Sequence, residues 1–228
     1  MMSFRSLLYL ATAVLLLLAP DAFAAEPGVD DTGQLQLVEQ DRHSAVFVQP
    51  GVDWTRYDSL LLDDATVAFR KNWLRDQNRS RRSLSERVST ADMERIKAEL
   101  AELFDEVFVA ELSGNDHWRL VDTAGPNVLR IRPQIVDLDV YAPDVSSSNY
   151  TRSYTDSSGS MTLKLELYDA DTGDLLAATA DRRDAPHRGY MQWTTSVSNK
   201  GDARRIMQQW AQTLSERLEA TAGHGSPD

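Results

Sequence analysis

The chain of 228 residues contains no cysteine. A chain without cysteine forms no disulfide bonds, so its packed core alone has to hold the fold together. The same absence excludes a zinc site with thiolate ligands, a cysteine nucleophile and a cysteine acceptor for a lipid anchor. Secreted eukaryotic proteins of this size usually carry disulfides, so an exported chain of this composition is more typical of a bacterial periplasm.

Positive charge and catalytic motifs are also scarce. Lys and Arg number 24 against 35 Asp and Glu, which gives a net charge of −11 and a pI near 4.8. Nucleic-acid binding needs clustered cations, so we expect no nucleic-acid partner. The four histidines form no i, i+4 zinc pair, and the sequence has neither a G-x-S-x-G elbow nor a glycine-rich phosphate loop. We therefore assign no catalytic residue, no metal ligand and no cofactor.

One long hydrophobic run is present, at the N-terminus. Arg5 precedes the apolar residues 7–19, and Ala22-Phe23-Ala24 follows them. This order is typical of a cleavable secretory signal, and the run is shorter than the about 20 residues of a membrane-spanning helix. We expect a signal peptide over residues 1–24 and a periplasmic mature chain that begins at Ala25. It should be soluble rather than lipid-anchored and should contain no transmembrane segment.

The remainder divides into a flexible N-terminal segment, one domain and a tail. Residues 25–44 are rich in Gly, Asp, Gln and Glu, which predicts a flexible segment. Residues 45–222 are long enough for a single domain with one core. We expect residues 223–228 to form a disordered tail.

Hydrophobic periodicity predicts the order strand, helix, several strands, helix. Ser89 followed by Asp92 has the form of a capping box at the start of the first helix. Strands are predicted at residues 58–69 (as one strand or as two with a break in the middle), 118–122 and 128–141, with a hairpin formed by 161–168 and 175–180. Helices are predicted at 90–112 and 202–220. The predicted fold is α+β, a two-layer sandwich in which a mostly antiparallel sheet of four to six strands carries two helices on one face.

A basic stretch between residues 70 and 87 is the most unusual feature of the mature chain. Its cations are Arg70, Lys71, Arg75, Arg79, Arg81, Arg82 and Arg87, and its acidic residues are Asp76 and Glu86. Such a cluster in an acidic protein favours binding to an anionic envelope surface or to an acidic envelope protein. The alternative is a solvated loop that neutralises part of its own protein.

Two acidic groups are further candidates. Residues 169–174 contain Asp169, Asp171 and Asp174, which are suitable calcium ligands but equally suitable for a tight hairpin turn. A second group consists of Asp63, Asp64, Asp137 and Asp139. If their strands are neighbours, these carboxylates can act together as a general acid and a general base. The alternative is that they lie separately on the solvent-exposed face of the sheet.

Three segments together carry a family resemblance. They read VFVQPGVDWTRYD at 46–58, GPNVLRIRP at 125–133, and GSMTL at 159–163 followed by LYDA at 167–170 and Thr172-Gly173. With them, residues 46–185 resemble a family of uncharacterised Gram-negative envelope proteins, a domain of unknown function that includes many lipoproteins. The resemblance implies location and class, and it supplies no catalytic residues. Ala25 stands where the lipoprotein members carry a lipidated cysteine.

These features predict an exported, non-enzymatic accessory or binding protein of the cell envelope, with residues 70–87 as its contact surface. They leave its oligomeric state open. One alternative is a metal-assisted hydrolase that uses Asp63, Asp64 and Asp137. The other is a binding module stabilised by calcium at the turn 169–174.

Overall fold

The computed structural model describes residues 35–79, 87–115, 117–140, 154–155, 159–185, 192–193 and 196–223. Its framework is an eight-stranded sheet in the order β1-β2-β9-β8-β6-β3-β5, with β4 also paired to β6. The strands are β1 (Gln36–Gln40), β2 (Ser44–Val48), β3 (Ser59–Leu62), β4 (Thr66–Phe69), β5 (Arg119–Leu120), β6 (Val128–Val140), β8 (Gly159–Asp169) and β9 (Leu175–Asp184); β7 (Tyr154–Thr155) and β10 (Gln192–Trp193) form a separate pair. The helices are α1 (Trp73–Asn78), α2 (Thr90–Ser113) and α3 (Ser196–Gly223).

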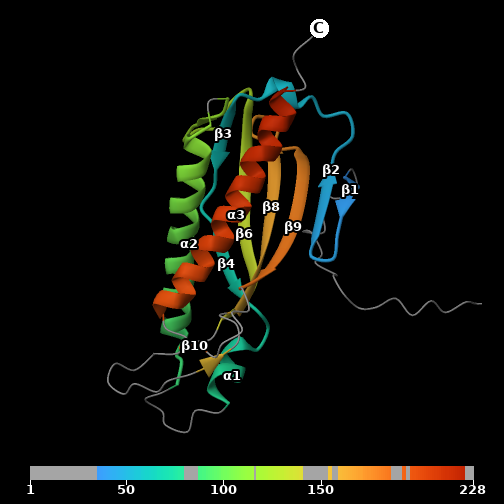
Figure 1. The fold of residues 1–228 in the computed structure, drawn as a ribbon. Coiled ribbons are helices and arrows are strands. Elements are labelled where there is room, and N and C mark those ends of the chain that lie inside the picture. The colour runs from blue at the N-terminus through green and yellow to red at the C-terminus, as the bar shows by residue number, and fades with distance from the viewer. Residues whose placement is uncertain are drawn as a thin grey trace, which may run out of the picture.

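The sheet is antiparallel from β1 through β6 and parallel where β3 and β4 pair with β6 and where β5 pairs with β3. It is larger than the four to six strands that we predicted. The difference arises chiefly from a hairpin of β1 and β2, which extends the sheet beyond β9 (Figure 1). Strand β1 lies within residues 25–44, for which the composition predicted a flexible segment.

Residues 58–69, predicted as one strand or as two, contain two strands. Strand β3 pairs with β6 as far as Ile131, and β4 resumes the pairing at Gln134. Pro133 falls in the interruption between them, which explains how a residue without a backbone N–H is accommodated in the central strand of the sheet. The chain between β3 and β4 carries Asp63 and Asp64.

Both long helices cover the same face of the sheet (Figure 1). Helix α2 begins at the predicted capping box, in which Ser89 and Asp92 exchange hydrogen bonds between side chain and backbone. Its buried stripe includes Phe104 and Phe108, whose rings stack with centroids 3.8 Å apart. Helix α3 buries Met207, Trp210 and Leu214 against the same core, together with the inward side chains Leu60, Leu129, Ile131, Ile135, Leu163 and Leu165 of the strands. Apolar burial on this scale is the main stabilising contribution to the fold.

The opposite face of the sheet carries half-exposed polar residues, as the alternation along β8 predicted. Arg132 stacks over the Tyr168 ring at 4.7 Å, and the Tyr168 hydroxyl donates to Glu166 at 2.8 Å. No helix among the described residues is both long and apolar enough to cross a membrane. The predicted signal peptide and the predicted tail lie outside the described residues, except that the helix α3 includes Gly223.

Candidate functional site

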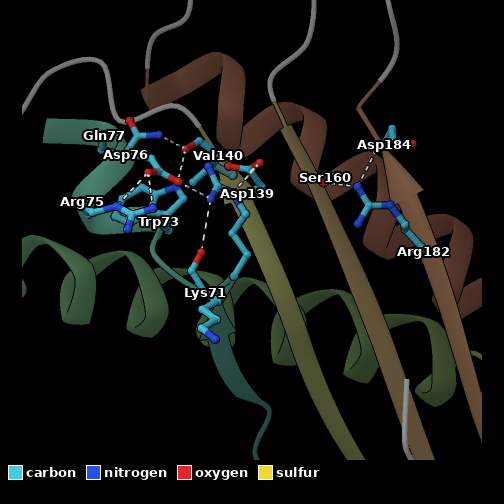
Figure 2. A network of polar contacts seen from close by, with 11 residues as sticks. Lys71, Trp73, Arg75, Asp76, Gln77, Asp139, Val140, Ser160, Arg182 and Asp184 are labelled. Atoms are coloured by element: carbon cyan, nitrogen blue, oxygen red, sulfur yellow. Dashed lines mark hydrogen bonds and ion pairs between the residues drawn. The ribbon is translucent and has the colours of Figure 1, made fainter. Parts of the chain in front are cut away.

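Helix α1, which sequence periodicity did not predict, sits at the start of the basic stretch and is fixed by Trp73. The Trp73 side chain is 1% exposed and stacks on Phe69 with ring centroids 4.0 Å apart. Its indole N–H donates to the Val140 carbonyl at 2.8 Å, and the Gln77 amide donates to the same oxygen at 3.2 Å (Figure 2). The first half of the basic stretch is therefore anchored to the end of β6.

Two cations of the basic stretch are neutralised within the protein. Arg70 contacts Asp76 through Nη1 and Asp139 through Nε, both at 2.8 Å. Arg75 contacts the other oxygen of Asp76 at 3.2 Å. The hydrogen bond from Arg70 holds the pKa of Asp76 below its usual value. Arg70 is half-buried between two carboxylates, whereas Arg75 is 71% exposed and shares Asp76 with Arg70.

The other described cations of the stretch are exposed. The Asn78 side chain donates to the Val88 carbonyl at 2.9 Å and accepts from the Val88 N–H at 2.8 Å. This pair of bonds brings together the two residues that flank 79–87, so that Arg79 and Arg87 adjoin the Asn78–Val88 contact. Along with Lys71, both are exposed and make no ion pair with any described residue. Arg81 and Arg82 lie outside the described residues.

The four aspartates of the second acidic group, three of which were candidates for metal-assisted hydrolysis, do not gather in one site. Asp63 accepts from Arg130 at 2.9 Å, Asp139 pairs with Arg70, and Asp137 is exposed at the bulge of β6 with φ of 51°. Within the described part of the chain, no group of three or more His, Asp or Glu side chains is placed to hold a metal ion.

Asp64 instead lies close enough to Asp105 of α2 to affect its ionisation. Burial and, to a lesser extent, the Asp64 charge raise the pKa of Asp105, while the Ala65 N–H opposes the shift. Asp105 was not among the carboxylates predicted from the sequence, and the pair joins the chain between β3 and β4 to helix α2.

The acidic turn 169–174 is a structural turn. Asp169 Oδ1 accepts from the N–H groups of Asp171 and Thr172 at 2.9 and 3.1 Å, while Oδ2 accepts from the Tyr57 hydroxyl at 2.9 Å. Burial, followed by this hydrogen bond, raises the pKa of Tyr57 to about 12. Burial alone would raise the pKa of Asp169, but the two backbone N–H groups, Tyr57 and Arg56 lower it below the usual value. The carboxylate is thus occupied by the protein's own donors.

A groove that the sequence did not predict lies between helix α3 and the strands β2, β9 and β8. Its volume is about 520 Å³. Val46 and Val48 of β2 form one wall, and Trp210, Leu214 and Leu218 of α3 form the other. The floor consists of Leu163, Leu165, Leu167 and Ala177, and Trp54 is also part of the lining. The α3 residues along the groove run from Trp210 to Thr221, which is about 16 Å of helix at 1.5 Å per residue.

Every charged side chain that lines this groove already has a partner within the protein. Glu39 pairs with Arg217 at 2.8 Å. Asp181 accepts from Arg183 and from the Trp210 indole, each at 3.0 Å. Asp41 accepts from the backbone of the β1–β2 turn, and the hydroxyls of Thr213 and Thr221 donate to α3 carbonyls. A ligand in the groove therefore meets an apolar surface with few free polar groups.

The family model described as "Protein of unknown function (DUF3313)" matches residues 30–214 of the chain. The chain belongs to this family. The match includes β1, β2 and the part of α3 up to Leu214, and hence one wall of the groove and part of the other. The finding agrees with the resemblance drawn from the sequence, which pointed to an uncharacterised envelope family. No curated protein matches the sequence.

This DUF3313 member also matches solved structures at low sequence identity and with TM-scores below 0.5. A protein from Xanthomonas campestris, described by the family model DUF330, is 11% identical, with a TM-score of 0.43; the alignment covers 78% of this chain and 91% of that one. The PelC dodecamer from Paraburkholderia phytofirmans is 10% identical, with a TM-score of 0.33 and coverage of 72% and 93%.

Sequence reasoning missed the groove of this DUF3313 member because its walls are far apart in the chain. Strand β2 was not among the predicted strands, and nothing local shows that it lines a groove with α3. The basic stretch was visible in composition, whereas the pairing of Arg70 with Asp139 depends on the long-range position of β6.

Proposed function

We propose that this protein is an exported, non-enzymatic binding protein of the cell envelope that holds a chain-like apolar ligand, such as a lipid acyl chain, in the groove between β2 and α3. The observation that carries the proposal is a long apolar cavity whose charged lining is already paired. The predicted signal peptide and the family resemblance support the envelope location.

The size and lining of the groove support a small-molecule ligand. Ligand sites usually measure about 300–1,000 Å³ and are mostly apolar with a few polar groups, and this groove has a volume of about 520 Å³. A sugar or a nucleotide requires several unpaired donors and acceptors, since buried polar groups without partners are costly. The polar side chains that such a ligand would need are already paired with each other, Asp181 with Trp210 and Glu39 with Arg217. An acyl chain needs none, and its length suits a cavity that follows α3.

The proposal is tested by titrating the mature protein with dansyl-labelled undecanoic acid and following dansyl fluorescence and anisotropy. We expect saturable binding at one site. Val46→Trp, which places a large ring in the groove, should weaken binding by at least about tenfold, equivalent to about 1.4 kcal/mol. Phe47→Trp is the matched control, because Phe47 lies on the opposite face of the same strand. Equal affinity of the two variants would show that the probe does not bind in the groove.

The basic stretch supports a second contact of the same protein, with an anionic envelope surface. Lys71, Arg79 and Arg87 carry this proposal, because they are exposed while Arg70 and Arg75 are held by aspartates. Exposed cations near an anionic membrane contribute about 1 kcal/mol each, and salt screens the attraction.

We expect the mature protein to bind vesicles of phosphatidylcholine with phosphatidylglycerol at low salt, and not vesicles of phosphatidylcholine alone. The double substitution Arg79→Glu and Arg87→Glu should abolish this binding in a flotation assay. The same two substitutions made at Arg95 and Arg119, two exposed arginines outside the stretch, are the control. Loss of binding in both double variants would indicate a general charge effect rather than a specific surface.

A further inference from the structure

We propose that the Glu39–Arg217 ion pair closes the mouth of the groove and controls how fast a ligand enters it. This inference rests on the proposed function, because it concerns access to the same site. Glu39 belongs to β1 and Arg217 to α3, and both line the groove. Their side chains meet at 2.8 Å although the residues are 178 positions apart.

The position of β1 supports this role. Strand β1 is the edge of the sheet and pairs with β2 alone. All five of its residues are exposed, including Leu37 and Val38 at 49% and 61%, so β1 buries little against the rest of the protein. The Glu39–Arg217 pair joins this loosely held edge to α3 across an apolar floor. Opening the pair removes this link between β1 and α3, while β1 keeps its backbone pairing with β2 and the core is undisturbed.

The next strand inward is held much more firmly. Strand β2 pairs with β9 over its whole length, and the turn before it is fixed by Asp41 and by a hydrogen bond from the Arg182 N–H to the His43 carbonyl. Movement is therefore confined to β1. An ion pair is suited to such a device because its two side chains are 53% and 48% exposed and can exchange partners with water. Little free energy is needed to break such an ion pair, and it can form again without any rearrangement of the core.

The test measures probe entry by stopped flow, using dansyl-labelled undecanoic acid. Glu39→Gln and Arg217→Gln should each raise the association rate by about two- to fivefold, the range that loss of an exposed ion pair allows. Salt should raise the rate of the natural protein by screening the pair, and it should have no such effect on these variants. The exchanged protein, Glu39→Arg with Arg217→Glu, should return to the slow rate and regain the salt dependence.

A matched control is the Glu106–Arg204 pair, which joins α2 to α3 at 2.9 Å with similar exposure and does not line the groove. Glu106→Gln should leave the association rate and its salt dependence unchanged. Unchanged rates in Glu39→Gln and Arg217→Gln, or an exchanged protein that behaves like the single variants, would overturn the inference.

A second measurement does not depend on ligand binding. Trp54 and Trp210, two of the chain's five tryptophans, line the groove, so a difference in acrylamide quenching between a variant and the natural protein reports changed access to them. Quenching should increase in Glu39→Gln and Arg217→Gln and return to the natural level in the exchanged protein. If the probe binds to no variant but quenching follows this pattern, the proposed function fails and the closing role of the pair stands. If the probe binds but breaking the ion pair changes neither the association rate nor the quenching, the closing role is wrong and the proposed function stands.

Discussion

Replacing Trp73 by alanine is expected to lower the free energy of unfolding by about 3–5 kcal/mol, the usual cost of truncating a buried tryptophan. Trp73 is 1% exposed, stacks on Phe69 and donates its indole N–H to the Val140 carbonyl at 2.8 Å. A helix as short as Trp73–Asn78 is not stable alone, so its position depends on this side chain. The loss is measured by urea unfolding followed by far-UV circular dichroism.

Leu74→Ala is the matched control, because Leu74 is the next residue of α1 and is only half-buried. We expect it to cost less than about 1.5 kcal/mol, because truncating a partly buried side chain leaves a smaller cavity. Trp73→Phe should fall between the two, since it keeps a ring against Phe69 and loses the hydrogen bond to Val140. If Trp73→Ala unfolds at the same urea concentration as Leu74→Ala, the packing of α1 described above is incorrect.

The elements that the sequence predicted well are those with strong local signals. Helix α2 has an apolar stripe and a capping box at Ser89, and both appear in the structure with the predicted start. The hairpin of β8 and β9 has strict alternation on one strand and an acidic turn with Gly173 at φ of 81°. Periodicity and turn chemistry are local properties, so a single sequence reveals them.

Two of the elements that it missed, β1 and α1, have weak local signals. Strand β1 is exposed on both faces, so it has no buried side to produce an alternating pattern. Helix α1 is six residues long and is positioned by Phe69, Val88 and Val140, which lie outside it. Tertiary packing rather than propensity determines both elements.

The candidate site could be predicted only in part for a related reason. Composition indicated the basic stretch, but the aspartates that neutralise Arg70 come from α1 and from β6. The groove requires β2, β8, β9 and α3 to meet, and the Glu39–Arg217 pair links positions 178 residues apart. Such contacts follow from topology, which the periodicity of a single sequence does not specify.

Replacing Asp169 by alanine is expected to destabilise the protein by about 3 kcal/mol, because several buried or partly buried donors lose one acceptor. Its side chain is 5% exposed and accepts from the Tyr57 hydroxyl and from the N–H groups of Asp171 and Thr172. The Tyr57 hydroxyl is left without this partner, and the turn between β8 and β9 loses its side-chain bonds. Thermal and urea unfolding at pH 7 measure the loss, and Asp171→Ala, at an exposed position in the same turn, should cost less than about 0.5 kcal/mol.

The pH dependence separates a structural carboxylate from a calcium ligand at the same turn. The pKa of Asp169 is lowered in the folded state, so its charge stabilises the protein above the unfolded-state pKa of about 3.9. This contribution is lost as the pH falls through the folded-state pKa. The stability difference between the natural protein and Asp169→Asn should therefore be largest near pH 7 and should shrink below about pH 4, with or without chelator. A difference that disappears at pH 7 when calcium is chelated would instead make Asp169 a metal ligand, because the donors from Tyr57 and the turn do not depend on a cation.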